Sequence, residues 1–134
     1  MTMRALIVDD SPAAQSIARF ALDDALAQLD ILLDIISVSG GIAALREIAK
    51  GDIGLLLCDL HMPDIHGLEV LQFWKKNKPK EGLAFIVTTQ VSIRDREKAE
   101  ALGASGFLAK PLTGMGLATS LKKFRVEKPR GDDP

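Results

Sequence analysis

Residues 55–67 read LLLCDLHMPDIHG, and this stretch decides the fold. Four apolar residues run directly into a carboxylate, and a turn rich in Pro, Asp and Gly follows. A continuous apolar run bounded by turn residues is typical of a strand that is buried on both faces of a parallel sheet. Asp59 is therefore predicted at the carboxyl end of a central strand, where open α/β sheets bind their ligands.

Four more apolar runs alternate with helical patterns along the chain. The predicted strands are 4–8, 35–38, 53–58, 83–87 and 106–109. The predicted helices are 12–29, 42–50, one from 67 through at least 74, 92–102 and 113–124. Five strand–helix alternations predict a parallel sheet with right-handed crossovers. The fold class is α/β, flavodoxin-like and doubly wound, a (βα)5 unit with the strand order 2-1-3-4-5.

Two of the predicted helices have distinctive apolar stripes. Helix 12–29 begins with Ser11 as N-cap and Pro12 as first helical residue. Phe20 and Leu26 lie outside its main stripe, which predicts apolar surface for a partner. Helix 92–102 has a thin stripe, comprising Ile93, Ala101 and Leu102, and is predicted to be the least firmly held.

Size and composition bound the class of protein. A chain of 134 residues with a net charge of -1 suits one globular domain, predicted at 1–125 and followed by a disordered tail at 126–134. The near-neutral charge argues against a nucleic-acid binder. No apolar run is long enough to span a membrane. The single cysteine, Cys58, cannot form an internal disulfide, which favours the cytoplasm.

Polar residues follow four of the five predicted strands. Asp9 and Asp10 follow the first strand, Asp59 the third, Thr88 the fourth and Lys110 the fifth. In a parallel sheet these ends share one edge, so the three carboxylates would repel one another. Oxygen ligands of this kind suit Mg²⁺. Acids, a metal, a lysine and a hydroxyl together indicate phosphoryl transfer, in which a carboxylate can be the nucleophile.

These residues also resemble a known family. Asp9-Asp10, the motif at 59–67, Thr88 and GASGFLAKP at 103–111 are similar to the receiver domains of two-component response regulators, of the CheY-like kind. The resemblance covers about residues 3–124. It implies that Asp59 accepts a phosphoryl group from a phosphohistidine of a sensor histidine kinase or a histidine phosphotransfer protein. Because no effector segment follows the last helix, we expect a stand-alone module, unless the chain is a fragment of a longer regulator.

The resemblance also implies a metal and phosphate site. Asp10 would bind Mg²⁺ directly and Asp9 through water, while Asp59 and the backbone carbonyl of His61 would complete the protein ligands. Lys110 would hold phosphoryl oxygens together with Thr88. The reaction that the resemblance implies is self-phosphotransfer followed by autodephosphorylation, with no catalysis on another substrate.

A switch is implied as well. In the family the hydroxyl at the position of Thr88 moves towards the phosphate, and the aromatic at the position of Phe107 turns inward. The fourth helix, fifth strand and fifth helix then form a face with altered affinity for a downstream protein. His61, Thr89 and Gln90 occupy positions that modulate phosphate lifetime. The oligomeric expectation is a monomer or a homodimer promoted by phosphorylation.

Other interpretations remain open on the sequence alone. A haloacid-dehalogenase-like phosphatase also uses a nucleophilic Asp with Mg²⁺, but places it after the first strand. A receiver-like scaffold that takes no phosphate and a flavodoxin-like cofactor binder are alternative binding modules. His61 and His66 with their neighbouring acids suggest a transition-metal site, although their spacing is not that of a helix face.

Overall fold

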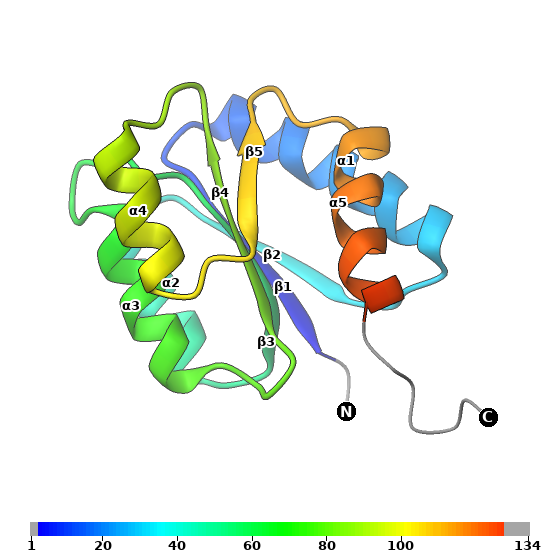
Figure 1. The fold of residues 1–134 in the computed structure, drawn as a ribbon, viewed down its shortest axis with the longest axis horizontal. Coiled ribbons are helices and arrows are strands. Elements are labelled where there is room, and N and C mark those ends of the chain that lie inside the picture. The colour runs from blue at the N-terminus through cyan, green and yellow to red at the C-terminus, as the bar shows by residue number, and fades with distance from the viewer. Residues whose placement is uncertain (1–2, 128–134) are drawn as a thin grey trace.

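The sheet and its helices have the predicted doubly wound arrangement. The computed structural model describes residues 3–127, apart from the side chains of residues 124–127. Five parallel strands pair in the order β2-β1-β3-β4-β5, which confirms the predicted fold class. Figure 1 shows α1 and α5 on one side of the sheet and α2, α3 and α4 on the other. The strands are β1 (Arg4–Val8), β2 (Asp34–Val38), β3 (Ile53–Cys58), β4 (Leu83–Thr88) and β5 (Gly106–Ala109). The helices are α1 (Pro12–Leu29), α2 (Gly41–Ala49), α3 (Gly67–Asn77), α4 (Ile93–Ala101) and α5 (Gly114–Glu127).

The central strand β3 is buried on both faces, as its apolar run predicts. Leu55 and Leu57 pack into the apolar cluster beneath α1 and α5. Leu56 and Cys58 pack into the opposite cluster beneath α2, α3 and α4. All four are at most 3% exposed, because successive side chains of a strand point to opposite faces and both faces are covered by helices.

Helix α1 begins as predicted but buries a wider face. The Ser11 hydroxyl accepts a hydrogen bond from the Ala14 amide at 3.2 Å, which confirms the N-cap. Phe20 is 76% exposed, as expected for a residue outside the stripe. The same prediction is wrong for Leu26, which is 5% exposed. The chain turns back after α1, where the Ile31 amide donates to the Leu26 carbonyl. Leu29, Ile31 and Leu33 then pack against the apolar cluster that contains Leu26.

Helix α4 is attached differently from the prediction. The predicted stripe is wrong for Ile93, which is 78% exposed, and for Ala101, which is also exposed, whereas Leu102 is partly buried against the cluster beneath α2, α3 and α4. The buried residue of the helix is Ala99, on the face of α4 that contacts α3. A helix that buries one alanine contributes little apolar area. This geometry supports the prediction that α4 is weakly held.

Helix α5 is longer than predicted. It continues to Glu127, so the first two residues of the predicted tail are helical. The reason is that the first helix-breaking proline after 113 stands at 129. The rest of the predicted tail, 128–134, lies outside the described residues, and the domain boundary at 125 stays a prediction. None of the described helices is long and apolar enough to cross a bilayer.

Candidate functional site

The carboxyl ends of four strands bring the predicted polar residues to one edge of the sheet. Within the described residues, the buried polar or charged side chains are Asp9, Asp59 and Thr88, which are 5%, 8% and 6% exposed. They follow or end β1, β3 and β4, and Lys110 follows β5 beside them. A protein buries charged groups only at a cost unless they are paired or bind a metal. The burial of these three side chains therefore marks the edge as a functional site.

Three aspartates form a cluster at this edge. One carboxylate oxygen each of Asp9, Asp10 and Asp59 lies within 4.8 Å of the other two. Asp10 is exposed, whereas the other two are buried. Closely spaced carboxylate oxygens with one side open to water match the preference of Mg²⁺ for oxygen ligands and retained waters. The residues present therefore fit this ion.

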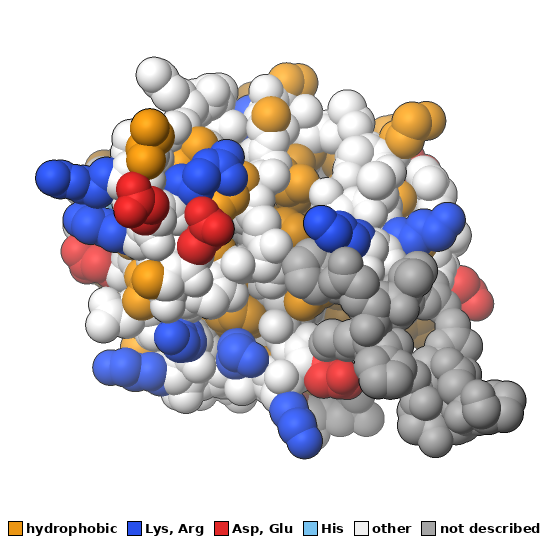
Figure 2. Space-filling view, in the orientation of Figure 1, with side chains coloured by type: hydrophobic (Ala, Val, Ile, Leu, Met, Phe, Trp, Pro, Cys, Tyr) orange, Lys and Arg blue, Asp and Glu red, His pale blue; other side chains and the backbone are white. Residues whose placement is uncertain are grey.

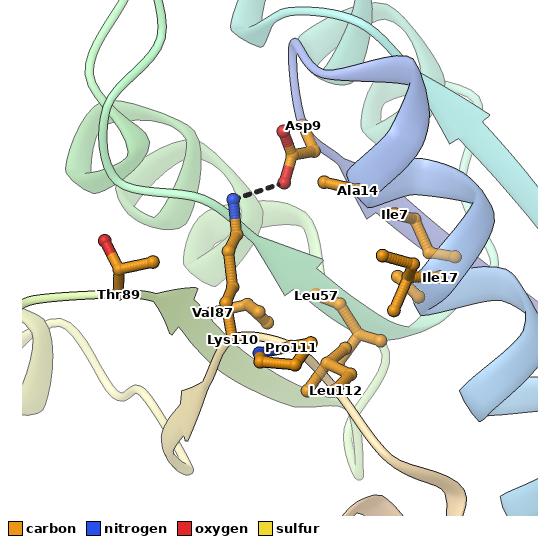
Figure 3. A pocket seen from close by; sticks show the side chains of 11 residues that line it. Ile7, Asp9, Ala14, Ile17, Leu57, Val87, Thr89, Lys110, Pro111 and Leu112 are labelled. Atoms are coloured by element: carbon orange, nitrogen blue, oxygen red, sulfur yellow. Dashed lines mark ion pairs between the residues drawn. The ribbon is translucent and has the colours of Figure 1, made fainter.

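Lys110 reaches across the cluster. Its Nζ lies 2.6 Å from Oδ2 of Asp9 and 3.4 Å from Oδ2 of Asp59, and Figure 3 shows its side chain extended from the end of β5 towards Asp9. Partial burial alone would lower the pKa of Lys110, but the two neighbouring carboxylates outweigh it and raise this pKa above its ordinary value. The ammonium is thus protonated at neutral pH, and it pairs with two of the three aspartates of the cluster.

Backbone contacts fix the position of Asp59. Its amide donates to the Val8 carbonyl at 2.9 Å, which extends the pairing of β3 with β1 by one residue. The Gly67 amide donates to the Leu60 carbonyl at 2.7 Å and closes the loop that follows. A Cβ at residue 67 would overlap the Asp59 carbonyl, so only glycine permits this approach.

The first acidic residue has two roles. Oδ1 of Asp9 accepts from the Ser11 amide at 2.9 Å, so the residue is both a turn former and a member of the cluster. The Asp9 carbonyl accepts from Nε2 of Gln15 at 2.7 Å. The same nitrogen also donates to the Val38 carbonyl and the Ser39 hydroxyl, at 3.2 and 3.1 Å. The sequence reasoning missed Gln15, because a polar residue in the first turn of a helix gives no signal of what it contacts.

The hydroxyl of Thr88 is engaged with its own loop. It donates to the Gln90 carbonyl at 3.0 Å and accepts from the Gln90 amide at 3.3 Å. Thr89 and Gln90 are exposed beside the acidic edge. Phe107 is half-buried against the cluster beneath α2, α3 and α4. The Arg96 guanidinium lies over its ring, 4.2 Å from the centroid, a contact that the sequence reasoning missed.

The transition-metal alternative, which the spacing of the histidines disfavours, gains no support from the structure. His61 is exposed, and its ring lies edge-on to the His66 ring at 5.5 Å. Nδ1 of His66 accepts from the Leu68 amide at 3.1 Å, so this histidine caps α3. Within the described part of the chain, the group that could hold a metal contains aspartates alone.

An apolar pocket of about 290 Å³ adjoins the site on the side of α1. Asp9 and Lys110 stand at its polar end, and Thr89 lies on the opposite side of Lys110 from Asp9 (Figure 3). The remaining lining side chains are apolar: Ile7, Ala14, Ile17, Ala18, Leu57, Val87, Pro111 and Leu112. The acidic edge thus has an apolar neighbour between α1 and the loop after β5.

Comparisons with known proteins agree with this geometry. A family model described as the response regulator receiver domain matches residues 5–122. The "Probable chemotaxis protein CheY" of Rhizobium etli is 34% identical over 83% of this chain and 83% of its own length. The "Protein-glutamate methylesterase/protein-glutamine glutaminase 2" of Caulobacter vibrioides is 33% identical over 96% of this chain, which spans 36% of that relative. The structure of the Vibrio cholerae chemotaxis protein CheY4 aligns with a TM-score of 0.76 at 24% identity, covering 92% of this chain and 99% of that one, and supports the fold alone.

Proposed function

Because the chain belongs to the family of response regulator receiver domains, we propose that Asp59 accepts a phosphoryl group from a phosphohistidine. The donor is a sensor histidine kinase or a histidine phosphotransfer protein. The observation that carries the proposal is the convergence of three carboxylates and one ammonium at the carboxyl edge of the sheet.

The chemistry follows from the arrangement of these groups. A carboxylate oxygen of Asp59 attacks the phosphorus atom, a P–O bond forms as the P–N bond breaks, and the donor imidazole leaves with the electron pair. Lys110 stands beside Asp59 and is placed to bind the phosphoryl oxygens, whose charge must be neutralised. Water later hydrolyses the acyl phosphate, which releases inorganic phosphate and restores the carboxylate, at a rate that His61, Thr89 and Gln90 modulate.

Magnesium has a defined place in this proposal. Asp10 and Asp59 would bind it directly, Asp9 through water, and the backbone carbonyl of His61 would complete the protein ligands. Bound Mg²⁺ supplies positive charge that neutralises the carboxylates and the incoming phosphoryl oxygens.

The proposed output is a change in the face formed by α4, β5 and α5. The Thr88 hydroxyl would leave Gln90 for a phosphoryl oxygen, and Phe107 would turn inward. Figure 2 looks onto this face and shows charges of both signs on α4. A downstream protein, or a second copy of the chain in a phosphorylation-promoted dimer, would bind there. Cys58 is a free cysteine and the chain has no second cysteine to pair with it, which favours a reducing cytoplasm.

The alternatives are weaker. A dehalogenase-like phosphatase places its nucleophile after the first strand, whereas Asp59 follows β3. A scaffold that takes no phosphate has no reason to bury two carboxylates beside a lysine. Multiple turnover on a small phosphate ester would favour the phosphatase.

Intact mass spectrometry after incubation with acetyl phosphate and Mg²⁺ tests the acceptor. We expect the addition of one phosphoryl group to the parent chain and none to Asp59→Asn. Asp52→Asn is the matched control, because Asp52 precedes β3 at the opposite end of the strand. Labelling that survives in Asp59→Asn would refute the assignment.

A second variant separates acceptance from response. Lys110→Ala should still take a phosphoryl group weakly, because the nucleophile remains, but should lose the conformational response that depends on the ammonium. Backbone NMR shifts of α4 and β5 with and without phosphoryl donor measure this response. Unchanged shifts in the phosphorylated parent chain would remove the switch from the proposal.

A further inference from the structure

Asp64, which lies in the loop after β3 and is not a member of the aspartate cluster, caps the N-terminus of α2. Oδ1 of Asp64 accepts from the Gly41 amide at 3.0 Å, and Oδ2 accepts from the Ile42 amide at 2.9 Å. The N-cap residue of α2 is Gly40, which has no side chain to cap the helix. Asp64 therefore provides the cap from another loop and satisfies two of the free amides of the first turn.

The fit between the loop and α2 is close. A Cβ at Gly40 would lie 2.9 Å from Oδ2 of Asp64, and its three nearest atoms would all belong to this carboxylate. Next to it, the Ile65 side chain lies directly against Gly41. The hydrogen bonds from Ile42, Gly41 and Ile65 hold the pKa of the Asp64 carboxyl below its usual range, so the cap is negatively charged at neutral pH.

This contact lies in the middle of the loop that carries the phosphoacceptor site. The loop leaves β3 at Asp59 and is closed by the hydrogen bond between Gly67 and Leu60. Between these ends, Asp64 hydrogen-bonds the loop to α2 across 22 and 23 residues of sequence. The backbone of His61 lies between Leu60, which is fixed by the hydrogen bond from Gly67, and Asp64, which is fixed by its hydrogen bonds to α2. Its position, and with it the direction of its carbonyl, depends on both.

We propose that Asp64 is a positioning residue that sets the affinity of the aspartate cluster for a divalent cation by anchoring this loop to α2. The inference rests on the proposed function, in which Asp59 and the His61 carbonyl act on the cation together. Groups that orient metal ligands typically change metal affinity by a factor of ten or more when they are removed. Asp64 would act on the metal only through the loop backbone.

The test measures Mg²⁺ binding without any phosphoryl donor, by NMR titration of the backbone amides. We expect Asp64→Ala to raise the apparent dissociation constant roughly tenfold, the lower end of the range for orienting groups. In the parent chain the Gly41 and Ile42 amide resonances should move during the titration, because the cap transmits the change. Thr113→Ala is the control, since the Thr113 hydroxyl also accepts from a helix amide, that of Gly116 at 3.0 Å, but on α5. It should lower thermal stability without moving the Mg²⁺ midpoint.

A reciprocal variant tests the same contact from the other side. Gly40→Ala places a methyl group against the Asp64 carboxylate and should also weaken Mg²⁺ binding. In the Asp64→Ala background the methyl group meets no carboxylate, so Gly40→Ala should add less than a twofold effect. Additive effects of the two substitutions, or a Mg²⁺ midpoint of Asp64→Ala within twofold of the parent, would overturn the proposal. Failure of the parent chain to take a phosphoryl group would overturn the proposed function instead, because the Mg²⁺ titration is independent of it.

Discussion

Asp10 is a residue that lowers the stability of the metal-free protein and is placed to bind a cation. It is the exposed member of the aspartate cluster, and Lys110 forms its ion pairs with the other two members. Like charges a few ångströms apart repel, and at a protein surface the repulsion is on the order of 1 kcal/mol or more. The apo protein therefore carries an electrostatic cost that a cation relieves.

Replacement of Asp10 by Asn should stabilise the protein in the absence of divalent cations. We expect the free energy of unfolding to rise by about 1 kcal/mol, because one of three repelling charges is removed. The additional stabilisation by Mg²⁺ should become smaller, because a ligand is lost. Urea unfolding with and without Mg²⁺ measures both effects, and Asp23→Asn on the exposed side of α1 is the control. A less stable Asp10→Asn variant in metal-free buffer would contradict the repulsion.

Helix α4 and strand β5 meet through one contact that bears on switching. The Arg96 guanidinium covers the Phe107 ring, and Ala99 is the buried side chain of α4. A cation–π contact at an exposed site contributes about 0.5–1 kcal/mol. On a helix held by little apolar area, such a contact is a substantial part of what keeps the resting arrangement in place.

Removal of this contact should favour the switched state. We expect Arg96→Met to shift the equilibrium about two- to fivefold towards that state, which corresponds to the lost cation–π energy. The amide shifts of β5 in the unphosphorylated variant should then move along the line that joins the resting and phosphorylated positions of the parent. Arg94→Met, an exposed position on the same helix, is the control. Shifts that leave this line would indicate local disturbance and not switching.

The whole molecule should respond to acid through an ion pair far from the site. Arg4 at the start of β1 donates to the Glu47 carboxylate at 2.7 Å and to the carbonyls of Glu47 and Gly51, at 2.9 and 2.8 Å. The hydrogen bond from Arg4, helped by Lys50, lowers the pKa of Glu47 from its ordinary value of 4.5. A lowered folded-state pKa gives stability that is present above the unfolded-state pKa and is lost as the pH falls through the folded-state pKa.

Glu47→Gln should therefore reduce stability at pH 7, and by less as the pH falls below the ordinary pKa of 4.5. The expected difference at pH 7 is about 0.5–1 kcal/mol, the range for a partly exposed ion pair, and it should shrink progressively below pH 4.5. Urea unfolding at a series of pH values measures it. Glu97→Gln at an exposed position of α4 is the control. A difference that stays constant from pH 7 to pH 3 would exclude charge as its cause.

The fold was predictable from sequence because its strongest signals are local. The apolar runs of β1, β3 and β4 and the turns that follow them report burial directly. The positions of Asp9, Asp59 and Lys110 then followed from the rule that parallel strands share one edge. The acidic cluster and its lysine could be expected in this way without coordinates.

What could not be predicted depends on contacts between distant segments. Leu26 is buried because the chain turns back over it, and Ala99 is the anchor of α4 because of how that helix lies on α3. Asp64 looked like one more acid in a turn, since its partners in α2 are 22 and 23 residues away. Local pattern carries no information about such pairs.

The place of Trp74 has a practical consequence. This lone tryptophan lies on the buried face of α3 and is 1% exposed. Its indole donates to the Ile53 carbonyl at the amino end of β3, while Asp59 follows the other end of the strand. Its fluorescence should therefore be insensitive to the phosphorylation state yet change sharply when the chain unfolds. Tryptophan emission therefore reports the folded fraction of the chain, and it can be recorded while mass spectrometry or NMR follows phosphorylation.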